Sequence, residues 1–137
     1  MLRVESKVRA RALQLLYAWE QQQRPPVRDV ADRALRLCRG ARREWNAAEA
    51  LAGAVASNAA ALDDEIAVVA EHWRLPRIGL VERNILRLGI HELERSDLPA
   101  PVVITEALRL ARWFAGAKAV PFVNGVLDQV ARRRGRL

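Results

Sequence analysis

Apolar side chains recur every three or four residues along most of this chain, and that spacing limits the possible folds more than any other feature. It is the period of one face of an α-helix. No segment sustains the apolar–polar alternation of a strand between turn residues. The sequence therefore predicts an all-α fold of about seven helices joined by short turns, packed as one bundle or a pair of bundles. The first apolar stripe consists of Val8, Ala12, Leu15, Leu16 and Trp19.

Proline and glycine mark the predicted helix ends. Pro25 and Pro26 end the first helix, because proline lacks the amide donor and clashes with the preceding turn. Pro101 can begin a helix, where its missing N–H costs nothing. The second helix is expected over about 27–39, with Val30, Ala34, Leu35 and Cys38 inward and Gly40 as the stop, and the next two over Arg43–Ser57 and Ala60–Trp73. The fifth follows Pro76 and Gly79 and carries an apolar stripe of Val81, Ile85, Leu88 and Leu93. The sixth follows Pro101, with Ile104, Ala107, Leu108, Ala111 and Phe114, and the last runs along Val123, Val126, Leu127 and Val130.

The length and composition indicate one folded domain. The chain has 137 residues, of which 51% are hydrophobic, so it can bury a core and is not disordered. No run approaches the length of a membrane span, and the charged N-terminus lacks the apolar core of a signal peptide. The single Cys38 excludes an intrachain disulfide. We therefore expect a soluble, cytoplasmic protein without a membrane partner.

The formal net charge of +7 is unevenly distributed. Residues 1–45 carry a net +6, residues 46–100 a net −4 and residues 101–137 a net +5. Such a chain can fold into a surface with a basic face for a polyanion and an acidic face for a basic protein. The alternative is a solvated arginine-rich surface, since all basic residues except Lys7 and Lys118 are arginine.

Signatures of an enzyme are missing from the sequence. Neither G-x-x-x-x-G-K-[ST] nor G-x-G-x-x-G occurs, so nucleotide binding has no motif. His72 and His91 lie too far apart for a metal site with one cysteine, and Cys38 sits on an apolar face as a small core residue. Asp63-Asp64-Glu65 suits the first turn of a helix better than acid–base catalysis. We expect no catalytic residue, cofactor or metal.

Several residues suit binding better. In the first helix Lys7 and Arg11 share one face with Arg9 beside them, although a solvated helix surface explains them equally well. The last helix begins near Lys118, where its amides can donate hydrogen bonds to a phosphate and Phe122 can stack on a base or pack in the core.

The rest of the last helix carries three further expectations. Asn124 is expected to make a buried hydrogen bond or a contact, and Gly125 to allow close helix–helix approach, because both are mediocre helix formers. Arg132–Arg136 is expected to be a mobile basic arm that attracts phosphates.

Several separate motifs resemble the NusB family of bacterial transcription antitermination factors. The match covers nearly the whole chain, and FVNGVLD is its most specific part. The N-terminal signature is matched by Arg9, Ala12, Leu13, Gln14, Leu16, Tyr17 and Trp19, and a weaker element by Asn58–Asp63. The R-x-I-L-R motif is matched by Arg83, Ile85, Leu86 and Arg87, and the E-L motif by Glu92-Leu93, with Asp97, Pro99 and Val102 after it. Ile104–Ala107 matches I-N-E-A, and Phe114 and then Phe122–Asp128, the FVNGVLD stretch, follow.

The resemblance implies a single RNA-binding domain over 1–137. It implies two helical bundles, with an N-terminal subdomain at about 1–58 and a C-terminal one at about 59–133, before a basic tail at 132–137. The implied partners are boxA-like single-stranded RNA, the ribosomal protein NusE and the RNA polymerase antitermination complex; a homodimer is left open. By position the resemblance implies RNA contacts at Lys7, Arg9, Lys118 and Phe122 and a partner contact at Glu82. We add Arg11 and Asn124 as expected RNA-binding residues, and Arg83 and His91 as expected partner-binding residues.

The chain departs from the family pattern near the implied RNA surface. The family usually carries arginines just before Lys7, an asparagine in I-N-E-A, and serine and lysine before FVNG. Two alternatives therefore stay open: an accessory domain of an rRNA methyltransferase, which would need a catalytic domain beyond Leu137, and a protein-interaction module with weakened RNA binding. The departing residues are Glu5, Ser6, Thr105, Ala119 and Pro121.

Overall fold

The computed structural model describes residues 4–37, 42–70 and 77–137, and every regular element in these ranges is helical. There are seven α-helices and one 3₁₀-helix, η2, so the predicted all-α fold is confirmed. The chain divides into two compact units, Met1–Asn58 and Ala59–Leu137. The expectations for Cys38, Gly40, His72, Trp73 and Pro76 fall outside the described residues.

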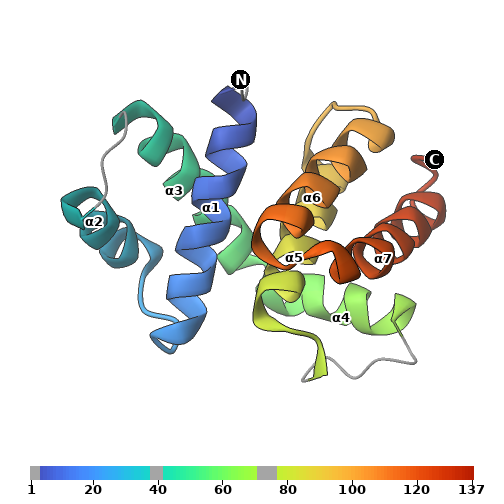
Figure 1. Ribbon diagram of the computed structural model, residues 1–137, viewed down its shortest axis with the longest axis horizontal. Helices are drawn as coiled ribbons and strands as arrows, with labels where there is room; N and C mark the ends of the chain where they lie inside the picture. Colours follow the sequence, from blue (N-terminus) through green and yellow to red (C-terminus); the bar gives the residue numbers. More distant parts are fainter. Residues whose placement is uncertain (1–3, 38–41, 71–76) are drawn as a thin grey trace. The chain divides into compact units, whose positions relative to one another are not determined.

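Unit 1 consists of α1 (Val4–Gln21), α2 (Val27–Leu37) and α3 (Arg42–Ser57). Each of the three helices contacts the other two, and α1 packs most extensively on α3 (Figure 1). The predicted stripe of α1 is buried from Ala12 onward, whereas Val8 is only partly buried. The core is completed by Val30, Ala31, Trp45, Ala48, Ala52 and Val55.

The first helix ends before the two prolines that were expected to stop it. It finishes at Gln21, and Gln23 and Arg24 then adopt left-handed φ values of 64° and 63°. The Arg24 amide donates to the Trp19 carbonyl at 2.8 Å, which satisfies one of the last carbonyls of the helix. The guanidinium of Arg24 lies 4.7 Å from the centre of the Trp19 ring. The turn itself therefore stops α1, and Pro26 stands immediately before α2.

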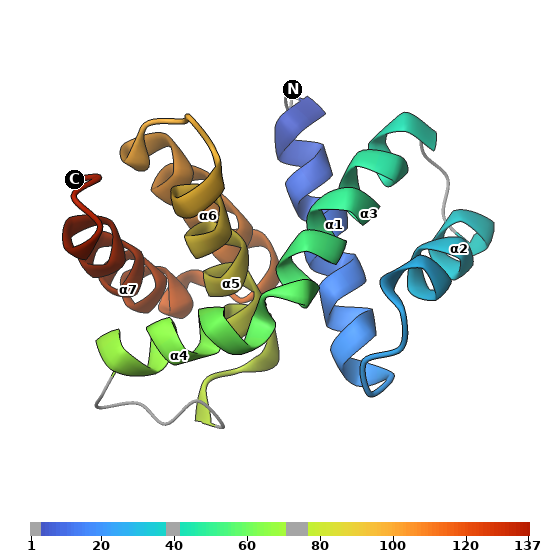
Figure 2. The same cartoon turned by 180° about the vertical axis from the view of Figure 1, so that it is seen from behind.

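Unit 2 is built around one central helix. Helix α5 (Leu80–Arg95) contacts α4 (Ala59–Val69), α6 (Ala100–Phe114) and α7 (Val120–Arg133), and η2 (Ala117–Ala119) precedes α7. Figure 2 shows α5 among these neighbours. Because it is packed on several sides, residues 84–90 are all buried, so α5 is more deeply enclosed than its single predicted stripe indicates. Phe114, expected in the α6 stripe, is 39% exposed at the end of that helix.

Helices α5 and α7 pack closely at Gly89, and the expectation for Gly125 is wrong. A Cβ placed on Gly89 would lie 2.9 Å from both δ carbons of the buried Leu127, so any larger residue would force that side chain to move. A Cβ on Gly125 would meet nothing within 4 Å. Asn124 is likewise exposed, and it makes no buried hydrogen bond.

A buried ion pair joins α4 to α5. Arg87 is completely buried, and its Nε and Nη2 donate to the two carboxylate oxygens of Asp63 at 2.7 and 2.8 Å. Its Nη1 donates to Oδ1 of the buried Asn84 at 2.9 Å. The expectation that Asp63 serves the first turn of a helix is wrong: α4 begins at Ala59 without an acid in that turn. The carboxylate instead compensates a buried guanidinium.

The basic tail is not a free arm. Arg134 binds Glu65 through both carboxylate oxygens at 3.0 and 2.6 Å, and its Nη2 also lies 3.4 Å from Glu94. These carboxylates raise the pKa of Arg134. Arg136 donates to the carbonyls of Leu93 and Leu98.

Two consequences follow for the tail. Arg132 pairs with Asp128 in the preceding turn at 2.9 Å, so three of its arginines are already engaged. Arg136 provides a donor for a carbonyl at the end of α5, where carbonyls lack helical partners. Arg134 neutralises part of the negative charge of residues 46–100 through Glu65 and Glu94. Within the described ranges no helix is both long and apolar enough to cross a membrane.

Candidate functional site

The basic residues of α1 are only partly available to a ligand. Lys7 and Arg11 are half-buried, and Arg9 is 9% exposed and engaged with other groups. The guanidinium of Arg11 lies over the ring of Trp45 on α3, 5.0 Å from its centre. The cation is therefore held against an aromatic face, unlike the freely solvated side chain of the alternative interpretation.

A second group of candidates lies in unit 2, where η2 leads into α7. Lys118 is exposed on η2, Phe122 is half-buried in the first turn of α7, and Asn124 is exposed one half-turn further. No side chain caps the start of α7, where the Val120 amide donates to the Ala117 carbonyl and Pro121 has no amide hydrogen. This short turn presents a cation beside an aromatic ring, a combination that can bind a phosphate and its base.

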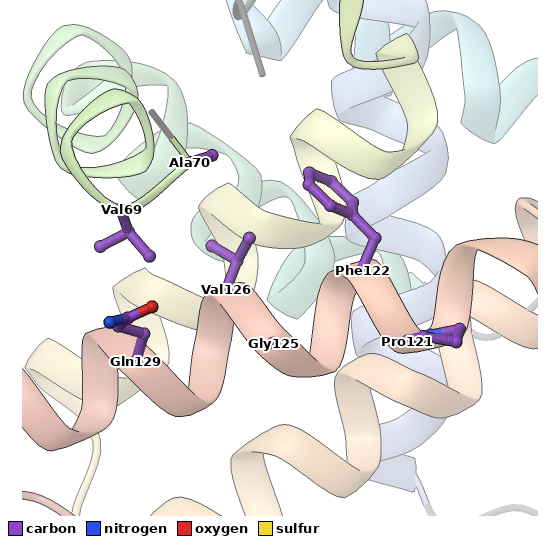
Figure 3. A pocket seen from close by; sticks show the side chains of 7 residues that line it. All are labelled: Val69, Ala70, Pro121, Phe122, Gly125, Val126 and Gln129. Atoms are coloured by element: carbon purple, nitrogen blue, oxygen red, sulfur yellow. The ribbon is translucent and has the colours of Figure 1, made fainter. Parts of the chain in front are cut away.

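Phe122 borders a hollow between α7 and the end of α4. The hollow has a volume of about 240 Å³, and Figure 3 shows the side chains of Phe122 and Val126 rising from α7 towards the side where Val69 faces them. Gly125 leaves one wall open because it carries no side chain. The lining residues are Val69, Ala70, Pro121, Phe122, Gly125, Val126 and Gln129.

Phe122 also lines a second hollow, in which the expected RNA contact Lys118 and the expected partner contact Glu82 lie together. It has a volume of about 250 Å³ and includes Lys118, Phe122 and Glu82, together with Arg77. The Glu82 carboxyl turns back over Gly79, where its Cδ would be 2.8 Å from an added Cβ. A carboxylate at this helix N-terminus is favourable. The two expected surfaces therefore meet here.

The expected partner contacts on α5 do not form one patch. Glu82 and Arg83 lie in its first turn, and His91 lies beyond the fully buried stretch 84–90. Eight to nine residues of helix correspond to about 12–14 Å along the axis. The Nε of Arg83 is buried without an acceptor in the described part of the chain. Burial lowers the pKa of His91 from 6.5, Arg95 lowers it further, and Glu92 and Glu94 oppose them.

The departures from the family pattern differ in exposure. Ser6 is 2% exposed and has partners, so it belongs to the interior. Glu5, Thr105 and Pro121 are exposed, and Ala119 is half-buried. Only the exposed positions can change the charge or shape that a ligand meets directly.

Sequence patterns did not identify several residues around Phe122. Val69 ends α4, Ala70 follows it and Arg77 precedes α5. All three lie about fifty residues from Phe122 in the sequence, so no local spacing links them. No group of three or more His, Cys, Asp or Glu side chains that could hold a metal occurs among the described residues.

Comparison with known proteins gives consistent results. Residues 6–132 match the model of the NusB family. The Transcription antitermination protein NusB of Solibacter usitatus is 43% identical over 129 residues, which cover 92% of this chain and 87% of that protein. The solution structure of NusB from Aquifex aeolicus superimposes with a TM-score of 0.84 at 26% identity, over 96% of this chain and 89% of that one.

A structure of a complex also matches. The crystal structure of the antitermination factors NusB and NusE in complex with double-stranded RNA contains a chain with a TM-score of 0.76 at 27% identity, covering 97% of this chain and 99% of that one.

Proposed function

This chain belongs to the NusB family, and on that premise we propose that it is a transcription antitermination factor that binds RNA together with NusE. The observation that carries the proposal is the family match over residues 6–132. The name of the Solibacter usitatus relative and the likeness to NusB in a complex with NusE and RNA support it. Antitermination acts on nascent transcripts, so we place the protein in the cytoplasm and assign it no reaction.

We propose that RNA binds in unit 2 at the turn between η2 and α7. Lys118 supplies a cation for a phosphate, and Phe122, which lines both hollows, offers an aromatic ring for a base. Asn124 is exposed on the same helix and can bond a base or a phosphate. This combination suits a single-stranded, boxA-like RNA, because an unpaired base can enter a hollow and stack.

The basic residues of α1 are proposed as the second RNA contact. Lys7 and Arg11 are half-buried and carry positive charge, and Arg9 adds charge from beneath the surface, since it is 9% exposed and engaged with other groups. Arg11 keeps its charge while it lies on Trp45, so a phosphate can approach the outer side of the guanidinium. The tail arginines are excluded from this proposal because Arg132 and Arg134 already bind carboxylates.

For NusE we propose the first turn of α5, with Glu82 and Arg83 as contacts. Both are half-buried in the first turn of the helix, and their side chains carry opposite charges that a partner's polar groups can meet. His91 is a separate contact, if NusE extends along the helix. The RNA polymerase antitermination complex would be reached through NusE.

The proposed RNA site is tested with side-chain replacements in otherwise intact protein. Lys118→Gln should weaken binding of a boxA-like single strand and reduce the slope of log affinity against log salt by about 0.7, the contribution of one phosphate contact. Phe122→Ala should weaken it about tenfold by loss of one stacked base. Arg132→Gln is the matched control, because that arginine is exposed but paired with Asp128. Equal losses in all three variants would reject this site in favour of general charge attraction.

A further inference from the structure

Unit 1 contains a hollow that the proposed RNA and NusE contacts do not use. It lies between α1, α2 and α3 and has a volume of about 320 Å³, within the range of small-molecule sites. Its apolar walls come from all three helices, and its polar residues are two glutamines and one arginine. The lining residues are Gln14, Leu15, Ala18, Gln22, Val30, Arg33, Ala34 and Trp45.

The polar groups of the hollow favour an anion. No carboxylate is among the lining residues. Arg33 donates through Nη1 to Oε1 of Gln22 at 2.9 Å, which fixes the guanidinium at the rim. Arg33 has no ion pair with a carboxylate in the described part of the chain, and four further N–H donors of its guanidinium are not used by Gln22. The hollow therefore has an uncompensated positive charge beside an apolar wall.

Trp45 forms part of the same wall and carries a buried donor beneath it. Its side chain is 2% exposed, and its Nε1 is buried without an acceptor among the described residues. The Nε of Arg11, which lies over the Trp45 ring, is in the same condition. The Trp45 indole N–H is therefore shielded from water and reports on changes in the wall when the hollow is filled.

From these features we propose that the hollow binds a small carboxylate with an apolar body. The carboxylate accepts hydrogen bonds from Arg33 at the rim, and the apolar body packs against Leu15, Ala18 and Ala34. The indole of Trp45 forms part of the wall from α3. A free small acid and the C-terminal residue of a peptide share this chemistry.

The probe is octanoate, titrated into the full chain, with octanol and octylammonium as ligands of equal length and different charge. Binding is followed by the NMR signal of the Trp45 indole N–H, assigned with Trp45→Phe. We expect saturable binding of octanoate, weaker binding of octanol and none of octylammonium. Two peptides ending in leucine, one with a free carboxylate and one amidated, identify the source. Tighter binding of the free-carboxylate peptide than of octanoate indicates a chain end, and the reverse indicates a free acid.

Variants separate the site from general surface binding. Arg33→Gln should weaken octanoate binding about tenfold or more, because a charge-assisted hydrogen bond is lost. Ala34→Leu should abolish it by filling the hollow, with circular dichroism as the check on folding. Arg36→Gln removes an exposed arginine from the same helix outside the hollow and should change nothing. Equal binding of octanoate and octylammonium, equal effects of the two arginine variants, or no saturable binding would overturn the proposal.

Discussion

Removal of the Asp63 carboxylate should destabilise unit 2 far more than removal of a surface carboxylate. Arg87 has no exposed side-chain area, and Asp63 has 18%. In Asp63→Ala the buried guanidinium loses both short bonds to the carboxylate, while its bond to Asn84 remains. Breaking a buried pair from one side costs about 3–5 kcal/mol, a large part of the roughly 5–15 kcal/mol that stabilises a domain. Urea unfolding followed by circular dichroism measures this loss.

The matched control is Asp128→Ala. Its partner Arg132 is bound at a similar distance, 2.9 Å, but the two side chains are 65% and 40% exposed for Arg132 and Asp128. Such pairs contribute about 0–1 kcal/mol. A loss below 1 kcal/mol in Asp63→Ala, or equal losses in the two variants, would refute the conclusion that burial makes the Asp63–Arg87 pair essential.

Three further predictions follow from the packing and charges of unit 2. Gly89→Ala should cost about 1–3 kcal/mol through overpacking, whereas Gly125→Ala should be neutral or stabilise by up to about 1 kcal/mol; urea midpoints of both variants test the contrast, and a stable Gly89→Ala would contradict it. Glu82→Gln should raise RNA affinity about threefold at low salt and less at high salt, because it removes a negative charge from the hollow that Lys118 also lines. Fluorescence anisotropy of a labelled RNA measures the affinity. Weaker binding by the variant would show that the carboxylate supports the site. Folding lowers the pKa of His91, so its contribution to stability is complete above about pH 6.5 and is lost as the pH falls through the folded pKa. The urea midpoint should therefore fall less between pH 7.5 and 5.5 in His91→Gln than in the unchanged protein. An equal fall in both proteins would contradict this prediction.

The helices were predictable because their cause is local. Apolar spacing and punctuation by glycine and proline gave the fold class and most helix positions, including the start of α6 beside Pro101. The end of α1 was misplaced because two non-glycine residues adopt left-handed conformations there, and the sequence carries no signal for Gln23 and Arg24 to do so. Their conformation is supported by the contact of Arg24 with Trp19.

Contacts between distant residues were not predictable from one sequence. The partners of Arg87 and Arg134 lie 24 and 69 residues away, so a fully buried arginine and a fixed tail both looked like surface charge. The same limit applies to Gly89 and Gly125, since only packing against α7 distinguishes a required glycine from an exposed one. Composition therefore overestimated the free positive charge at the C-terminal end.

The candidate site was predictable only in its local part. Lys118 and Phe122 are close in sequence and border the same hollow. The meeting of Glu82 with Lys118 was not expected, because opposite charges in separate sequence segments suggested separate faces. The assignment of these residues to RNA and NusE stays a prediction.

The central claim, that this chain joins RNA to NusE, is tested most directly by one titration. Labelled boxA-like single-stranded RNA is titrated with the protein at 50 and 200 mM salt, with and without purified NusE. We predict binding that weakens with salt, as phosphate contacts require, and that tightens when NusE is present. Affinity that is the same with and without NusE, or no binding to RNA at either salt concentration, would contradict the claim.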